Sequence, residues 1–69
     1  MELNSALLIM ARSENAICRR EFWGESAKHV YLETCTSEGD SLILVNEAGG
    51  EAMFTPSLDD LIACDWLMG

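Results

Sequence analysis

The residues LILVNEAGGEAMFT, at positions 42–55, place the strongest constraint on the fold of this chain. Residues 42–47 carry the β-branched Ile43 and Val45 among leucines, a composition typical of a strand. The sequence Ala48-Gly49-Gly50 favours a tight hairpin connection, and residues 51–55 then return as a second strand. This stretch therefore predicts an antiparallel sheet.

Patterns before this hairpin predict a helix and two further strands. Asn4 or Ser5 can cap the helix, and the polar residues 13–15 end it. Its expected inward face consists of Leu3, Leu7, Met10 and Ala11. The expected order after the helix is a strand over residues 16–23, a turn over 24–27, a strand over 29–35 and a loop over 36–41.

The segment after the hairpin predicts a short helix and a closing strand. Thr55 can be the N-cap with Pro56 at the first helical position, where its missing N–H is harmless. Asp59 and Asp60 suit the positive end of the helix dipole, and the expected inward face is Leu58, Leu61 and Ile62. The last strand spans residues 65–68. The predicted fold class is α+β in one domain, residues 1–69: a small antiparallel sheet of four to five strands, an N-terminal helix, and a short C-terminal helix before the last strand.

The size of the chain limits the core that it can build. A chain of 69 residues buries only about 60% of the surface that its unfolded form exposes. Hydrophobic residues make up 49% of the sequence and the mean hydropathy is +0.10, so some apolar surface should face a partner. Self-association is therefore expected.

The charge and the cysteines exclude several classes of protein. A formal net charge of -8 argues against binding nucleic acid or an anionic membrane, and is typical of a solvated acidic surface. Cys18, Cys35 and Cys64 are odd in number and widely spaced, which indicates small buried residues rather than disulfides. The N-terminal sequence lacks the leading positive charge of a signal peptide, and its apolar run is too short to span a membrane. We expect a cytoplasmic protein with no metal and no cofactor.

The sequence contains no recognisable catalytic set. A cysteine nucleophile would need a base, and His29 is the only histidine. Asp59 and Asp60 are adjacent, so on a helix they point about 100° apart and do not form an obvious acid–base pair. Gly49-Gly50 is a hairpin signal rather than a phosphate-binding loop. We therefore expect no enzyme, but a protein that binds.

The residues best suited to binding gather in the sequence RREFWG. Arg19 and Arg20 precede Phe22 and Trp23, and guanidinium groups beside aromatic rings can recognise the phosphates and bases of a nucleotide. Asp60 or Asp65 could accept hydrogen bonds from ribose or base. On a strand, Phe22 and Trp23 would lie on opposite faces, so one of them is expected to be exposed. Large aromatic residues such as Trp66 are more often core.

Two segments of the chain resemble the Thoeris anti-defence 2-like family of phage proteins. The terminal motif FTPSLDDLIACDW, residues 54–66, fixes its proline, serine, acidic and tryptophan positions at set spacing. The front segment LNSALLIMARSENAICRREFWG, residues 3–24, is a looser match. Together they cover about half of the chain.

The resemblance implies a protein that is not an enzyme but a sponge for immune signals. Family members form oligomers, typically tetramers, and sequester cyclic nucleotide signals such as glycocyclic ADP-ribose isomers or cyclic oligonucleotides at sites between subunits. A dimer or tetramer in the cytoplasm of an infected bacterium is expected here. The implied ligand-binding residues are Arg19, Arg20, Phe22, Trp23, Phe54, Thr55 and Asp65.

The chain departs from the family pattern at two aromatic positions. Alignment on Arg19 puts Phe22 in the place of the family tryptophan, whereas alignment on Arg20 puts Trp23 there, and both stay open. Phe54 stands where a tryptophan is common. Convergence of Arg12 and Lys28 on the two arginines would offset the net charge locally. Under this hypothesis, Arg19→Ala or Arg20→Ala abolishes ligand binding without unfolding the protein.

An acidic inhibitor that binds a defence protein is the alternative class. Such a protein, for example an anti-CRISPR in a nucleic-acid channel, would bind through its carboxylates, and its affinity would fall steeply as the salt concentration rises. Its sensitive positions would be Glu38, Asp40, Glu47 and Glu51. An orphan phage protein with no ligand is a third reading.

Overall fold

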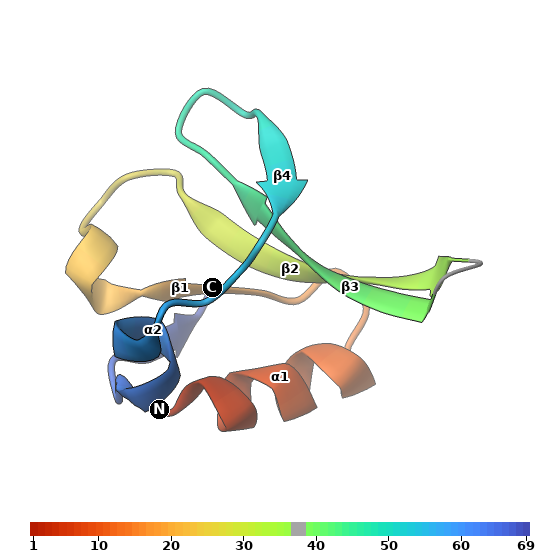
Figure 1. The fold of residues 1–69 in the computed structure, drawn as a ribbon, viewed down its shortest axis with the longest axis horizontal. Coiled ribbons are helices and arrows are strands. Elements are labelled where there is room, and N and C mark those ends of the chain that lie inside the picture. The colour runs from red at the N-terminus through yellow and green to blue at the C-terminus, as the bar shows by residue number, and fades with distance from the viewer. Residues whose placement is uncertain (37–38) are drawn as a thin grey trace.

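A five-stranded antiparallel sheet with two helices forms the fold (Figure 1), which confirms the predicted α+β class. The computed structural model describes residues 1–36 and 39–69. The strands follow the spatial order β4-β3-β2-β1-β5, so the closing strand lies beside β1 at one edge. The elements are α1 (Leu3–Arg12), β1 (Ile17–Arg20), the 3-10 turn η1 (Glu21–Trp23), β2 (His29–Thr36), β3 (Gly39–Val45), β4 (Glu51–Met53), α2 (Leu58–Ile62) and β5 (Trp66–Met68).

The first predicted strand is shorter than the sequence indicates. β1 ends at Arg20, and residues 21–23 turn away from the sheet as η1. The Glu21 N–H donates to the carbonyl of Asp65, and the Gly24 N–H closes the turn on the Glu21 carbonyl. Gly24 has φ 67°, a left-handed backbone that glycine adopts without strain. The expectation of a strand through residue 23 was therefore wrong, whereas β3 begins earlier than expected, at Gly39.

Both predicted helix caps were also wrong. Ser57, not Thr55, caps α2: its hydroxyl accepts the Asp60 N–H at 3.2 Å, and the Asp60 carboxylate accepts the Ser57 N–H at 3.0 Å. This reciprocal capping box satisfies two N–H groups that the helix leaves free, so the helix starts after Pro56 and Ser57. Helix α1 begins at Leu3 with Glu2 as N-cap, which makes no side-chain cap hydrogen bond.

The core lies between α1 and the face of the sheet that α1 covers. Leu3, Ala6 and Met10 are buried on α1, and they form one cluster with Cys18, Val30 and Trp66. In the sheet register Cys18 is opposite both Val30 and Met68, so these side chains share the covered face. The expected inward face of α1 is confirmed for Leu3 and Met10 and partly for Leu7, whereas Ala11 is exposed.

The predicted inward face of α2 faces solvent instead. Leu58, Leu61 and Ile62 are 73%, 55% and 68% exposed. They occupy positions i, i+3 and i+4 on one side of the helix, and Asp60 occupies the other side. The side with Asp60 is held against the domain, because Trp66 Nε1 donates to the Asp60 carbonyl at 3.0 Å and Arg20 binds the Asp60 carboxylate. Polar contacts, not apolar burial, therefore orient α2.

Candidate functional site

A buried arginine organises the end of the molecule where η1, α2 and the N-terminus lie together (Figure 1). The Arg20 side chain is only 7% exposed. Its Nε donates to Asp65, and its Nη1 donates to Asp60 at 2.7 Å and to Asp59 at 3.3 Å. These hydrogen bonds, that to Asp65 foremost, raise the pKa of Arg20, so the guanidinium stays charged. One cation therefore joins β1 to both ends of the α2 segment.

Asp65 connects this arginine to the 3-10 turn. Its second carboxylate oxygen accepts the Phe22 N–H at 3.1 Å, and its carbonyl accepts the Glu21 N–H at 2.9 Å. The hydrogen bond from Arg20, with help from that of Phe22, lowers the pKa of Asp65. The position of η1, and of the two aromatic residues on it, is thus set by an ion pair formed with a residue more than forty positions away in sequence.

Three aromatic rings pack at right angles beside the arginine. Trp66 is fully buried, and the rings of Trp23 and Phe54 lie nearly perpendicular to it, with centroids 5.6 Å and 6.0 Å away. Edge-to-face pairs of this kind stabilise a core beyond the area they bury. The prediction that Trp66 belongs to the core is confirmed, and Trp23 and Phe54 are half-buried around it.

Phe22 is the aromatic ring that the turn presents to solvent, with 78% of the residue exposed. One side of the ring faces the Arg20 guanidinium, whose Cζ lies 5.6 Å from the centroid. The expectation that either Phe22 or Trp23 is exposed is confirmed, but the strand alternation that led to it is absent, since both residues lie in η1. An exposed ring on a rigid turn is suited to stack on a planar ligand.

Two further cations lie beside η1. The Lys28 ammonium lies 4.6 Å from the centre of the Trp23 ring, a cation–π contact. Arg19 alternates with Arg20 along β1, so its side chain points away from the covered face, and its Nη1 donates to the Gly24 carbonyl at 3.3 Å. Among the described residues, no carboxylate lies within ion-pair distance of Arg19 or Lys28. Both therefore keep their charge available to an anion.

The predicted binding residues are thus brought together to different degrees. Arg20, Phe22 and Asp65 contact one another directly, and Trp23 and Phe54 join them through Trp66. Thr55 is exposed in the segment between β4 and α2. The expected fourth cation, Arg12, lies at the other end of α1, where it lines a separate hollow.

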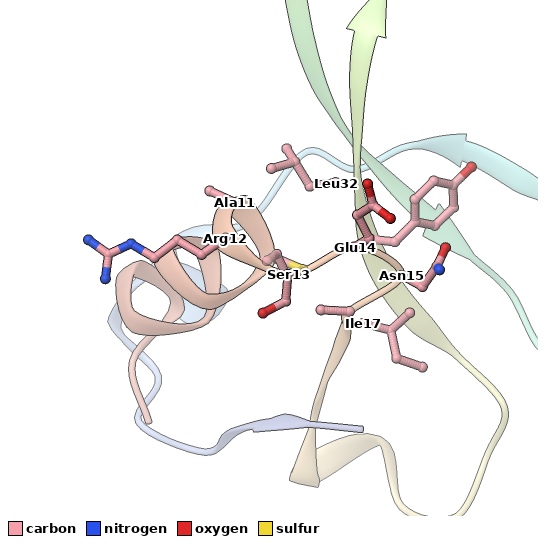
Figure 2. Close-up of a pocket in the computed structure, with 10 residues that line it drawn as sticks. Ala11, Arg12, Ser13, Glu14, Asn15, Ile17 and Leu32 are labelled. Atoms are coloured by element: carbon pink, nitrogen blue, oxygen red, sulfur yellow. The ribbon is translucent and has the colours of Figure 1, made fainter.

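That hollow, of about 550 Å³, is a feature that the sequence analysis missed (Figure 2). It is lined by residues 10–17 together with Tyr31 and Leu32. Glu14 and Asn15 lie on one side of it, whereas the Arg12 side chain points away from them (Figure 2). Asn15 has φ 62°, and asparagine just after a helix end is a known signal for this left-handed conformation, which could have indicated the sharp turn. A second, mostly apolar hollow of about 540 Å³ adjoins it along Leu7, Leu8 and Ala11.

Among the residues that the structure describes, the histidine and the two cysteines outside this cluster lie apart from one another. His29 bonds the Ala27 carbonyl through Nδ1 at 2.7 Å rather than a cysteine. Cys18 is buried, as expected. This burial raises the pKa of its thiol to about 11, which disfavours the thiolate. Cys64 is exposed, contrary to expectation, and the side chain of Cys35 lies outside the described residues.

Within residues 1–36 and 39–69, no three His, Cys, Asp or Glu side chains form a metal site, and no helix is long and apolar enough to cross a membrane.

Stability should decrease when acid protonates the partners of Arg20. Burial favours a raised pKa at Asp60, but hydrogen bonds from Ser57 and Arg20 outweigh it, so the pKa is lowered, as it is at Asp65. In the unfolded chain both titrate near the ordinary value of about 3.9, so below about pH 5 the unfolded state binds more protons. The Tm should be constant above about pH 5 and fall as the pH drops through the lowered folded values. Thermal melts followed by circular dichroism test this, and a Tm that rises on acidification would contradict it.

The comparisons with known proteins identify the family. A family model described as the Thoeris anti-defense 2-like (Tad2-like) domain matches residues 1–68 of the 69. The match extends over the segments between the two motifs, so it covers much more of the chain than the motifs alone. No curated protein and no solved structure matches significantly. The chain belongs to the Thoeris anti-defense 2-like family.

Proposed function

We propose that this anti-defence protein binds and sequesters a cyclic nucleotide signal of a bacterial immune system, and releases it unchanged. The observation that most supports this proposal concerns the turn η1. Phe22 on this turn is 78% exposed, while the Arg20–Asp65 pair fixes the backbone beneath it. A ring carried on a backbone that is already held in place loses less conformational entropy when a base stacks on it. The membership in an anti-defence family supports this choice among ligands.

The site residues take different roles in this proposal. Phe22 stacks on a base, and Arg19, with Lys28 beside it, neutralises phosphate. Arg20 and Asp65 hold the turn in place, since their charges are already paired with each other. Trp23 and Phe54 form the wall behind the ligand, and Thr55 offers a hydroxyl at its edge. Arg19 and Lys28 make no ion pair among the described residues, so they are the cations that an anionic ligand can approach at η1.

Sequestration without cleavage agrees with the chemistry of these side chains. Hydrolysis of a phosphodiester needs a base, a metal or a nucleophile next to the scissile bond. Asp59, Asp60 and Asp65, the carboxylates that pack against this end of the sheet, all accept hydrogen bonds from Arg20. The pKa of Asp60 and that of Asp65 are lowered, which makes these two carboxylates weaker bases. We therefore propose a binding protein that is not an enzyme.

Calorimetric titration of variants with cyclic ADP-ribose isomers and cyclic oligonucleotides tests the proposal. Phe22→Ala should weaken binding roughly 5- to 150-fold, because one base–aromatic stack contributes about 1–3 kcal/mol. Arg19→Ala should weaken it by about tenfold or more. Met53→Ala is the matched control, since Met53 is as exposed as Phe22 but lies on β4, and it should bind like the wild type. Wild-type affinity in both Phe22→Ala and Arg19→Ala would exclude this site.

An acidic inhibitor of a defence protein is a second candidate function, because exposed carboxylates lie along β3, β4 and their connection. Asp40, Glu47 and Glu51 are all exposed along β3, β4 and their connection, whereas Glu38 lies outside the described residues. A protein that used this surface would capture a basic partner, and its affinity would fall steeply between about 50 and 500 mM salt. Charge neutralisation at these residues would then matter, and Phe22→Ala would not.

A further inference from the structure

Asp59 is the carboxylate that the pairing of Arg20 needs least. It lies 3.3 Å from the Nη1 of Arg20, and 78% of its side chain is exposed. Asp60 binds the same Nη1 at 2.7 Å with a side chain that is only 17% exposed, and Asp65 binds the Nε. The capping hydrogen bonds of α2 are made by Ser57 and Asp60, which leaves Asp59 only a small contribution to the helix dipole. Its charge is therefore available to act on molecules that approach from solvent.

This exposed carboxylate lies close to the ring on which we propose that a base stacks. The Cζ of Arg20 is 5.6 Å from the centre of the Phe22 ring, and Asp59 contacts the same guanidinium. These contacts put the carboxylate within about 10 Å of the ring, which is one Debye length at about 0.1 M salt. One positive charge is shared among three carboxylates, so it does not neutralise that of Asp59. Asp59 therefore repels a phosphate that is bound beside Phe22.

We propose that Asp59 is a specificity-determining residue, which selects cyclic phosphodiesters against nucleotides that end in a terminal phosphate. This inference rests on the proposed function. A phosphodiester carries a single negative charge, whereas a terminal phosphate carries close to two at pH 7. Arg19 and Lys28 attract both kinds of ligand, but the repulsion from Asp59 increases with each charge on the ligand. The more highly charged linear nucleotides are therefore rejected more strongly, and the protein gains selectivity at some cost in affinity.

The electrostatic effect of Asp59 can be measured without any signal molecule. Two soluble nitroxides, the anionic carboxy-PROXYL and the neutral carbamoyl-PROXYL, increase the NMR relaxation of the amide protons that they approach. The ratio of the anionic to the neutral effect at the Phe22 N–H should rise roughly 2-fold in Asp59→Asn at about 0.01 M salt. Glu14→Gln is the matched control, because it removes an equal charge beyond the other end of α1 (Figure 1), and it should leave the ratio unchanged. A wild-type ratio in Asp59→Asn would overturn the inference.

Calorimetric titration then measures the selectivity itself. ATP is the probe with a terminal phosphate, and cyclic diadenylate and cyclic ADP-ribose are the probes without one. Asp59→Asn should tighten the binding of ATP more than that of a cyclic probe, so that the preference for the cyclic probe falls roughly 4-fold or more at low salt. Glu14→Gln should keep the wild-type preference, and circular dichroism melts check that both variants are folded.

The two measurements separate a failure of this inference from a failure of the proposed function. An unchanged or larger preference for the cyclic probe in Asp59→Asn would overturn the inference while the proposed function stands. If neither cyclic probe nor any other signal binds the wild type, but the nitroxide ratio at Phe22 rises in Asp59→Asn, the proposed function fails and the repulsion by Asp59 is supported.

Discussion

Replacing Arg20 with alanine is expected to destabilise the protein by about 3–5 kcal/mol, because removal of one member of a buried ion pair leaves the other charged and unpaired. Three carboxylates depend on this one guanidinium, and it also fixes η1 through Asp65. A chain of this length has a total stability of roughly 3–10 kcal/mol, so the variant should be largely unfolded or melt far below the wild type. Urea denaturation followed by circular dichroism measures the difference.

Arg19→Ala is the control for this change. Arg19 lies on the same strand and makes one long hydrogen bond, from its Nη1 to the Gly24 carbonyl at 3.3 Å. Its removal should change stability by no more than about 0.5 kcal/mol, while it weakens ligand binding. The sequence led us to expect that Arg20→Ala leaves the fold intact. Because Arg20 is buried, we now expect this variant to be destabilised. An Arg20→Ala protein with the wild-type midpoint would show that the ion pairs do not hold this end of the molecule.

Replacing Trp66 with alanine should have an effect of similar size, about 3–5 kcal/mol. Trp66 is fully buried, two aromatic rings pack nearly perpendicular to it, and its Nε1 donates to the Asp60 carbonyl. The change would open a cavity between α1 and the sheet and release α2. Thermal and urea melts should show a much lower midpoint or a less cooperative transition.

Trp66→Phe separates the two contributions of this side chain. Phenylalanine retains much of the apolar contact but cannot donate to the Asp60 carbonyl, so an intermediate loss of about 1–3 kcal/mol is expected. Phe22→Ala serves as the control, because an exposed ring contributes little to folding. If Trp66→Ala were no less stable than Phe22→Ala, the ring would not be the centre of the core.

The sequence allowed the sheet and both helices to be predicted, because local patterns determine them. Ile43 and Val45 with the following glycines indicated the β3–β4 hairpin, which the structure confirms. Cap choice was less accessible, since two hydroxyl residues flank Pro56. The spacing of Ser57 and Asp60 fits a reciprocal cap and could have identified the correct one.

The arrangement at Arg20 could not be predicted from the sequence. Its partners Asp59 and Asp65 lie 39 and 45 positions away, and no local pattern gives their distance in space. From the sequence alone, Arg19 and Arg20 are equivalent candidates for ligand contact. Nothing in the sequence predicts that the leucines of α2 face solvent. The tertiary contacts of one buried cation therefore distinguish the two arginines and orient α2.

Native mass spectrometry of the purified protein with a panel of cyclic ADP-ribose isomers and cyclic oligonucleotides tests the central claim most directly. We predict that one class of signal adds its full, uncleaved mass in stoichiometric amount, and that Phe22→Ala greatly reduces the adduct. A wild-type spectrum in which no member of the panel adds mass, or in which the signal is recovered as a cleavage product, would contradict it.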